Sequence, residues 1–318
     1  MEARSINILV TGCAGFIGSH IVERLLLYGH EVIGIDNYDS YYDPQIKRRN
    51  VAPFIADDNF ISIEGDIRDE ELICKILENI DCIFHEAAQA GVRASVEDPM
   101  KSHEINATGT LKLLKAALDS DVKTFVYASS SSVYGRVRYL PFDEEHPKSP
   151  VSPYGISKLI AEYYCNIFYE LYGLKTTSLR YFTVYGPRMR PDLAINIFTQ
   201  CALRNRTIEI FGDGLRTRDF TFIDDVVDAN ILAMNDKRGV YNIGSGNSIS
   251  IRDLADHIIR LTKSSSKLKF LSPAKGDSEH TMACIKRAED RLGWKPKVDI
   301  NKGLERYVKW ATKERNDD

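Results

Sequence analysis

The chain reads Thr11-Gly12-Cys13-Ala14-Gly15-Phe16-Ile17-Gly18 directly after an apolar, strand-like run at residues 6–10. The three glycines form a G-x-x-G-x-x-G pattern between a predicted strand and a predicted helix. Gly12 permits a tight turn, Gly15 lets the backbone approach a pyrophosphate closely, and Gly18 lets the helix pack against the sheet. The amino end of that helix offers free N–H groups and a positive dipole end to phosphates. The stretch therefore predicts a phosphate-binding turn in an α/β sheet.

An acidic residue, Asp36, stands at the end of the second predicted strand, eighteen residues after Gly18. Its carboxylate is placed to accept hydrogen bonds from the ribose hydroxyls of NAD. An acid at this position would also repel the 2′-phosphate of NADP, and the next residue is Asn37 rather than an arginine. A glycine turn that only joins a strand to a helix does not need the acid. The glycine turn together with Asp36 predicts NAD as the cofactor.

Short β-rich runs alternate with amphipathic helical stretches through the first half of the chain. Strands are predicted at residues 6–10, 31–35, 60–64, 82–85, 124–128 and 176–181, and helices at 15–28, 70–79, 101–120 and 152–172. A polar stretch at residues 39–59 predicts a partly helical excursion. Apolar β-rich runs of this length suit strands that are buried on both faces. The βαβ alternation predicts an α/β fold with a doubly wound parallel Rossmann sheet.

The strict alternation ends near residue 182, where Gly-Pro, Arg-Pro and Gly-Asp-Gly sequences begin to separate shorter elements. The change predicts an NAD-binding domain over residues 1–182 and a smaller mixed α/β substrate-binding region over residues 183–318. Segments within about 220–245, among them 226–234 and 240–243, are candidates to return to the main sheet.

The composition argues against several classes of protein. The 318 residues include 42 basic and 45 acidic side chains, so the net charge is −3, and 43% of the residues are hydrophobic. A disordered protein would have a more polar chain of larger net charge. A protein that binds nucleic acid or an anionic membrane surface would have a basic chain. No apolar run reaches the ~20 residues that cross a bilayer, and the first residues lack the pattern of a signal peptide. Six scattered cysteines without a Cys-x-x-Cys pair predict reduced thiols in the cytoplasm and no metal site.

A tyrosine and a lysine, Tyr154 and Lys158, stand at positions i and i+4 of a predicted helix. Their Cβ atoms should lie about 5–6 Å apart on one face. A lysine ammonium beside a tyrosine lowers the pKa of the phenol and makes it a base near neutrality. Chance alone produces such a pair in a chain of this composition, so the weight comes from its position after the fifth strand. That strand runs into serines 129–132, which either present a hydroxyl to the same substrate oxygen or form a capped turn.

Two further segments follow predicted strands. Ala87-Ala88-Gln89 leaves room for a flat ligand at the carboxyl ends of the strands. Asp66, with Ile67 after it, is suited to border the adenine, although an aspartate that caps a helix fits the spacing equally well.

Taken together, these motifs resemble the extended short-chain dehydrogenase/reductases of the NAD-dependent epimerase/dehydratase family. The resemblance covers nearly the whole length and includes residues 180–187 and 216–220. It implies a nucleotide-diphosphate sugar above the nicotinamide of NAD, and a homodimer formed through two helices of each subunit. The candidate cofactor-binding residues are Gly12, Gly15, Phe16, Ile17, Gly18, Asp36, Asn37, Asp66, Ile67, Ala87, Ala88, Gln89, Asn106, Tyr154, Lys158 and Tyr181.

The resemblance also assigns roles on the substrate side. It implies Tyr154, Lys158 and Ser130 as the catalytic residues, with Ser130 as the hydroxyl partner of Tyr154. It places Arg218 at the diphosphate, where the planar fork of a guanidinium is well suited. The candidate substrate-binding residues are Arg93, Ser130, Ser131, Ser132, Thr183, Arg190, Asn196, Arg218 and Asp277.

The serine run also narrows the reaction. In dehydratases of this family, the strand that resembles this one ends in an Asp-Glu pair. In a related decarboxylase, the similar strand carries a glutamate directly before Val-Tyr-Gly. Ser131 and Ser132 occupy those positions here, which leaves 4-epimerisation by transient oxidation at carbon 4. The resemblance is most detailed to the UDP-glucuronate 4-epimerase family, at residues 87–93 and 182–192.

The substrate is less closely defined. The hydroxyl of Thr183 and a guanidinium at Arg190 or Arg93 are suited to recognise the C6 carboxylate of UDP-glucuronate. UDP-glucose 4-epimerases more often carry asparagine at the position of Thr183, and Arg188 and Arg190 are equally suited to be surface charges of a loop. UDP-glucose, UDP-N-acetylglucosamine and net NAD-dependent oxidation or reduction remain alternatives. A non-catalytic NAD sensor would need neither Tyr154 nor Lys158.

Overall fold

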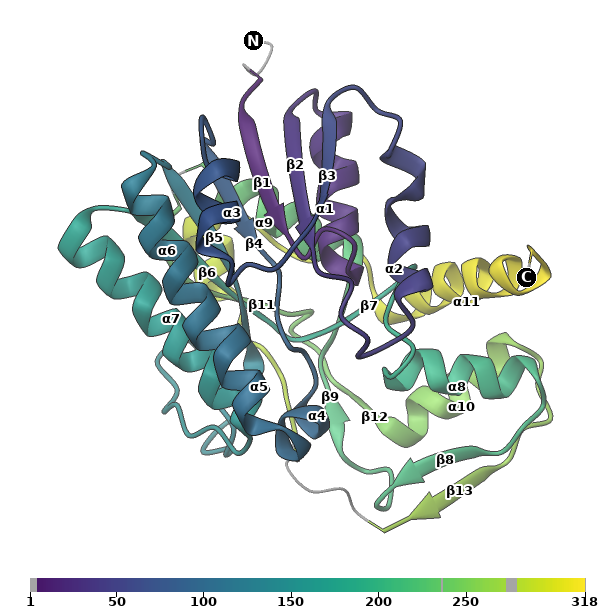
Figure 1. The fold of residues 1–318 in the computed structure, drawn as a ribbon. Coiled ribbons are helices and arrows are strands. Elements are labelled where there is room, and N and C mark those ends of the chain that lie inside the picture. The colour runs from purple at the N-terminus through teal and green to yellow at the C-terminus, as the bar shows by residue number, and fades with distance from the viewer. Residues whose placement is uncertain (1–4, 236, 273–278, 318) are drawn as a thin grey trace.

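A seven-stranded sheet forms the centre of the computed structural model, which describes residues 5–235, 237–272 and 279–317 (Figure 1). The strand order is β11-β6-β5-β4-β1-β2-β3, and every neighbouring pair is parallel. The chain enters at β1, fills one edge, and then crosses to β4 and fills the other. The predicted doubly wound Rossmann sheet is therefore confirmed.

The strands of this sheet lie close to the predicted ranges. They are β1 Asn7–Thr11, β2 Glu31–Asp36, β3 Phe60–Glu64, β4 Cys82–His85, β5 Thr124–Ser130, β6 Lys175–Tyr181 and β11 Gly239–Ile243. Strands β4 and β5 are buried along their whole length, as expected for the middle of a sheet that is covered on both faces. Strand β5 continues two residues beyond its prediction, so Ser130 is its last residue.

Helices cover both faces of the sheet. They are α1 Phe16–Leu27, α2 Pro44–Val51, α3 Glu70–Ile76, α4 Val92–Glu97, α5 Pro99–His103, α6 Thr110–Asp119, α7 Pro153–Tyr172, α8 Ala194–Leu203, α9 Ile223–Ala233, α10 Ile251–Leu261 and α11 Ile300–Asp317. Apolar side chains of α3, α6 and α7 pack on one face, and those of α1 and α9 pack on the other. None of the described helices is long and apolar enough to cross a membrane.

One predicted helix is wrong in detail. Residues 101–120 do not form one regular helix, because a π-helical turn, Glu104–Gly109, separates α5 from α6. Such a turn adds a residue to the helix and re-aims its side chains, and it is frequent at functional sites. Here it carries Asn106 inward, where that side chain is almost fully buried.

The second half of the chain builds smaller elements at the carboxyl ends of the main strands. Three two-stranded sheets pair β7 Thr183–Tyr185 with β10 Phe220–Phe222, β9 Thr217–Arg218 with β12 Ile249–Ser250, and β8 Ile208–Phe211 with β13 Leu268–Leu271. The chain also returns to the main sheet, as β11 beside β6, while residues 226–233 belong to α9, which covers the sheet instead of joining it. Because of this return, the division into residues 1–182 and 183–318 stays a prediction.

Candidate active site

The glycine turn between β1 and α1 has the backbone geometry that its sequence predicts. Gly12 has φ +68°, in the left-handed region, and its N–H donates to the carbonyl oxygen of Ile35 at the end of β2 (2.7 Å). A Cβ atom at Gly18 would lie 2.1 Å from the carbonyl oxygen of Gly12. The close contact that needs Gly18 is therefore with the turn itself, at the tip of β1, rather than with the sheet.

The first turn of α1 presents backbone donors to a cavity. The N–H of Ser19 makes the first helical bond, to the carbonyl oxygen of Gly15 (3.1 Å). The amides of residues 16–18 precede that bond, so helical geometry leaves them without an intrahelical acceptor. Phe16, Ile17 and Gly18 line the cavity. These amides and the positive end of the helix dipole suit a pyrophosphate.

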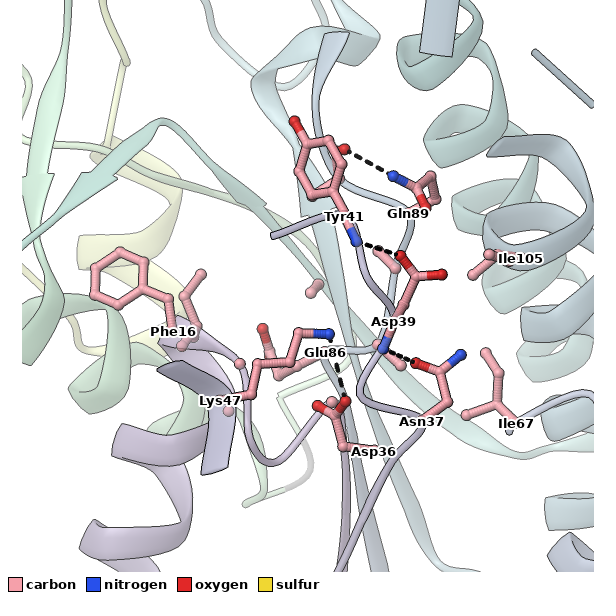
Figure 2. A pocket seen from close by; sticks show the side chains of 18 of the residues that line it. Phe16, Asp36, Asn37, Asp39, Tyr41, Lys47, Ile67, Glu86, Gln89 and Ile105 are labelled. Carbon is pink, nitrogen blue, oxygen red and sulfur yellow. Dashed lines mark hydrogen bonds and ion pairs between the residues drawn. The ribbon is translucent and has the colours of Figure 1, made fainter. Parts of the chain in front are cut away.

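Asp36 lies at the neighbouring wall of the cavity (Figure 2). Its carboxylate accepts hydrogen bonds from the N–H groups of Ala14 (3.2 Å) and Tyr38 (2.8 Å). Lys47, from α2, forms an ion pair with it at 3.6 Å and lines the cavity as well. Lys47 is not among the residues that the sequence predicts for the site, because the polar excursion that carries it has no recognisable motif. The carboxylate keeps acceptor capacity for ribose hydroxyls, since a carboxylate offers about four lone-pair sites.

Asn37 and Asp66 lie side by side beyond Asp36. The amide of Asn37 donates to Asp66 at 3.1 Å. Arg68 makes a hydrogen-bonded ion pair with Asp66 at 2.8 Å, and this bond is the main cause that lowers the pKa of Asp66 to about 2. Asp66 is therefore an anion, and its backbone bond to Arg68 is a turn within its own loop rather than a helix cap.

The cavity continues from these acids to the amino-terminal half of α7. Most predicted cofactor residues line it: Gly12, Gly15, Phe16, Ile17, Gly18, Asp36, Asn37, Asp66, Ile67, Ala87, Ala88, Gln89, Tyr154, Lys158 and Tyr181. One elongated cavity thus joins the glycine turn to the tyrosine and lysine of α7, which is the arrangement that a dinucleotide requires.

Asn106 is the predicted cofactor residue that is not among the lining residues. Its Oδ1 accepts from the N–H of Gln89 (2.8 Å), and its Nδ2 donates to the carbonyl oxygen of Gln89 (3.1 Å) and to Ser157 (3.0 Å). Ser157 stands between Tyr154 and Lys158 on α7. Asn106 therefore links the segment after β4 to α7 by hydrogen bonds, and its connection to the cavity is through Gln89.

Tyr154 and Ser130 meet at the far end of the cavity. Burial raises the pKa of the Tyr154 phenol, while its hydrogen bond with Ser130 and the nearby charge of Arg190 lower it. Lys158 donates from Nζ to the carbonyl oxygen of Ala128 (2.8 Å), and burial lowers its pKa to about 8. The direct effect of Lys158 on the pKa of Tyr154 that the sequence predicts is not among these causes.

Arg190 also lines the cavity, but its guanidinium already has an acidic partner. Its Nε and one terminal nitrogen donate to the two carboxylate oxygens of Asp192 at 2.9 and 3.0 Å. The hydroxyl of Tyr41 donates to the same carboxylate (3.0 Å). Arg190 is thus held in place beside Tyr154, and Asp192 takes only one edge of its guanidinium, so donors on the other terminal nitrogen remain.

The remaining predicted substrate residues that the structure describes are not among the residues that line the cavity. Ser131 and Ser132 form a 3₁₀ turn, Ser131–Val133, and the serine that lines the cavity is Ser129. Asn196 donates to backbone oxygens of the loop that carries Arg190, at 3.5 Å. Asp277 lies outside the described residues.

Three further residues of this set have partners within the chain. Thr183, half-buried in β7, donates from its N–H to the carbonyl oxygen of Asp219 (3.0 Å). Arg93 lies over the ring of Phe211 at 4.5 Å, and Arg218 bonds to the carbonyl oxygen of Glu279 (3.2 Å). Arg188, which the sequence left open as a surface charge, is paired with Glu23 of α1 and is not among the lining residues.

Comparisons with known proteins agree with this geometry. A family model described as GDP-mannose 4,6 dehydratase matches residues 9–307. A putative UDP-glucose 4-epimerase of Methanocaldococcus jannaschii is 40% identical over 308 residues, which are 95% of this chain and 97% of the relative. A UDP-glucuronate 4-epimerase of Thermodesulfobacterium geofontis is 39% identical over 308 residues, 95% of each chain. The crystal structure of UDP-glucuronic acid 4-epimerase from Bacillus cereus, in complex with UDP-glucuronic acid and NAD, superposes with a TM-score of 0.93 at 35% identity, covering 97% of this chain and 100% of that one.

Proposed function

Since the chain belongs to the GDP-mannose 4,6-dehydratase family of NAD-dependent epimerases and dehydratases, we propose that it is a UDP-sugar 4-epimerase that interconverts UDP-glucuronate and UDP-galacturonate. One observation carries the proposal: Tyr154, bonded to Ser130, stands at the end of a cavity whose other end is the glycine turn and Asp36. A relative named as a UDP-glucuronate 4-epimerase and one named as a putative UDP-glucose 4-epimerase both match nearly the whole chain.

The residues of the cavity fit NAD. Residues 16–18 offer amides for the pyrophosphate, and Asp36 offers acceptors for a ribose that carries no phosphate. Lys47 offsets part of the negative charge of Asp36 without removing the carboxylate. NAD, when bound, takes up a hydride from carbon 4 of the sugar and returns it to the opposite face, so no net oxidation results.

Side chains of the protein itself transfer the proton of the sugar's 4-hydroxyl. The Tyr154 phenolate takes the proton from the 4-hydroxyl of the sugar, and the Ser130 hydroxyl donates a hydrogen bond to the forming ketone. Before the sugar binds, the hydrogen bond with Ser130 and the charge of Arg190 offset part of the cost of burial, which still leaves the pKa of Tyr154 above its usual value. The 4-keto sugar then turns about its phosphate linkage, and Tyr154 returns the proton to the oxygen on its other face. A closed site limits the exposure of the ketone to water.

The serine turn contains no carboxylate that could act as acid or base for elimination or decarboxylation. Ser131 and Ser132 supply hydroxyls where related dehydratases and a related decarboxylase are expected to carry carboxylates. A hydroxyl of ordinary pKa is a poor general base, so the 4-keto sugar has hydride return as its productive route.

A second candidate substrate is the neutral sugar of UDP-glucose. Asp192 already takes one edge of the Arg190 guanidinium and offsets its charge, which weakens one predicted partner of a C6 carboxylate. The relative from Methanocaldococcus jannaschii is named a putative UDP-glucose 4-epimerase. Recognition of UDP-glucuronate then rests on Thr183, Arg93 and the remaining donors of Arg190.

Incubation with UDP-glucuronate, UDP-glucose and UDP-N-acetylglucosamine, followed by chromatography of the products, tests the proposal. We expect the 4-epimer of UDP-glucuronate to form without added NAD being consumed. Turnover confined to the neutral sugars would overturn the carboxylate assignment, and stoichiometric reduction of added NAD would identify a dehydrogenase instead.

We also propose that the protein is a homodimer that acts in the cytoplasm, where its six free thiols would stay reduced. Helix α7 exposes Ile156, Tyr163, Ile167 and Leu171, and the adjoining α4 and α5 expose Val96 and Met100. Contiguous exposed apolar surface of this kind usually marks a protein–protein interface. Helices α4 and α5 both pack against α7, and Figure 1 shows α5 beside α7 with α4 at its lower end.

The double substitution Tyr163→Glu/Ile167→Glu is expected to produce a monomer, because four carboxylates per dimer would be buried at the interface without partners. Light scattering after size-exclusion chromatography measures the mass. Leu27→Glu is the matched control, since Leu27 is 76% exposed on α1, outside this face, and its substitution should leave the dimer intact. A dimer that survives the double substitution would contradict the proposed interface.

A further inference from the structure

A carboxylate that the proposed mechanism does not use, Glu86, lies among the catalytic groups. It directly follows β4, where the chain leaves the sheet after His85. It lines the same cavity as Tyr154, Lys158 and Tyr181. Figure 2 shows its side chain among those that surround the pocket.

The orientation of Glu86 is set by two neighbours. The hydroxyl of Tyr181, at the end of β6, donates to Oε1 of Glu86 at 2.8 Å. The amide of Asn230, on α9, donates to the Tyr181 oxygen (2.7 Å) and to the carbonyl oxygen of Val226 (2.9 Å). The Tyr181 hydroxyl also lies 3.0 Å from Oδ1 of Asn230, but an ionised Glu86 is the stronger acceptor for its single proton. Elements of both halves of the chain therefore hold this carboxylate in place.

The charge of Glu86 has no ion-pair partner among the residues that the structure describes. Lys158 is near enough for the two charges to act on each other's pKa, but its Nζ is bonded to the carbonyl oxygen of Ala128. Burial raises the pKa of Glu86 to about 7. A half-buried carboxylate in this position is costly by itself, and a cation bound in the cavity would stabilise it.

We propose that Glu86 is the counter-charge of the oxidised nicotinamide ring and that it favours the oxidised over the reduced form of the bound cofactor. The proposal rests on the proposed function, which requires the hydride acceptor to lie within reach of carbon 4, whose hydroxyl is bound at Tyr154. The oxidised ring carries one positive charge, and the hydride taken from carbon 4 neutralises it. A fixed carboxylate at this end of the cavity thus interacts more favourably with the ring before hydride uptake than after it.

This bias has a consequence for the reaction. Beside the Glu86 carboxylate, the 4-keto sugar and the reduced ring are less stable, relative to the 4-hydroxyl sugar and the oxidised ring, than they would be beside a neutral side chain. Hydride return is then favoured, and the ketone is less often lost to solvent. Glu86 would be a positioning charge for the cofactor rather than an acid or base for the sugar.

The test compares the affinities for NAD⁺ and NADH of the unaltered protein and of Glu86→Gln, without any sugar present. Glutamine keeps the size of the side chain and an oxygen that can accept from Tyr181. We expect the ratio of the two dissociation constants to shift about tenfold toward NADH, equivalent to about 1.4 kcal/mol. Asp66→Asn, at the other end of the cavity, is the control: it removes a charge from the same cavity and should leave the ratio unchanged.

The outcomes separate this inference from the proposed function. An unaltered protein that binds neither form of the cofactor would contradict the proposed function. If it binds both, and Glu86→Gln changes the ratio by less than about twofold or weakens both forms equally, the role of Glu86 is wrong while the epimerase assignment stands. A second readout is the near-ultraviolet absorbance of reduced nicotinamide after UDP-sugar is added, which should be higher in Glu86→Gln.

Discussion

Tyr154→Phe is expected to lower the turnover of the epimerase by about 10²–10⁴-fold while the protein still binds NAD. The substitution removes one oxygen, the atom that bonds with Ser130 and whose charge Arg190 stabilises. It leaves the glycine turn, Asp36 and the ring of residue 154 in place, so the cofactor cavity keeps its shape. The reaction loses the group that moves the proton of the 4-hydroxyl.

The measurement combines product chromatography with titration of NAD binding. Tyr172→Phe serves as the matched control, because Tyr172 stands on the same helix but is 54% exposed, and its substitution should change neither quantity. Activity of Tyr154→Phe within tenfold of the unaltered protein would exclude Tyr154 as the base. Loss of NAD binding in this variant would indicate a structural effect instead.

Arg180→Met is expected to lower the free energy of unfolding by about 3–5 kcal/mol, because it leaves a buried carboxylate without its partner. Arg180 donates to both oxygens of Glu162, at 3.0 and 2.6 Å, and the two side chains are 2% and 1% exposed. Further bonds join Arg180 to the hydroxyl of Tyr134 (2.8 Å) and to the carbonyl oxygen of Glu144 (3.1 Å). The pair therefore ties β6 to α7 and to the segment after β5.

The consequence of Arg180→Met should reach the active site. Glu162 stands one turn after Lys158 and also accepts a hydrogen bond from Ser129 (2.7 Å), the neighbour of Ser130. A displaced Glu162 would shift the serine that bonds with Tyr154, so we expect turnover to fall together with stability.

Denaturant titration of Arg180→Met measures the loss of stability. Glu71→Gln is the matched control: it breaks the exposed ion pair with Lys75 on α3, and such i, i+4 pairs contribute about 0.3–0.5 kcal/mol. The double substitution Arg180→Met/Glu162→Leu should recover part of the loss, since it removes the unpaired charge. A loss below about 1 kcal/mol for Arg180→Met would contradict the assigned role of the pair.

Several features of the active site could not be predicted from the sequence, and each depends on contacts between distant segments. Tyr41 donates a hydrogen bond to the Asp192 carboxylate that holds Arg190, although Tyr41 stands about 150 residues earlier in the chain. Lys47 reaches Asp36 because α2 folds back over the glycine turn. Such contacts leave no periodic signal in the sequence, so a side chain's partner cannot be deduced from its neighbours along the chain.

The π-helical turn that carries Asn106 is another case. Local propensity over residues 101–120 favours an unbroken helix, and the bonds that Asn106 makes to Gln89 and Ser157 accompany the irregular turn instead. Tertiary hydrogen bonds can override propensity because differences in propensity amount to less than about 1 kcal/mol per residue. A buried asparagine without partners would cost more than that.

By itself, the sequence determined the parallel sheet, the glycine turn after β1, Asp36 at the end of β2, and the tyrosine and lysine one turn apart on α7. Each of these follows from local geometry: the period of strands and helices, the conformational freedom of Gly12, and the i, i+4 spacing of a helix. Only the tertiary structure decided which groups act on the phenol of Tyr154, which cations are already paired, and that Glu86 lies at the catalytic end of the cavity without an ion pair to any described residue. The physical reason is that pKa values and ion pairs depend on burial and on charges within a few ångströms, which the packing of distant segments sets.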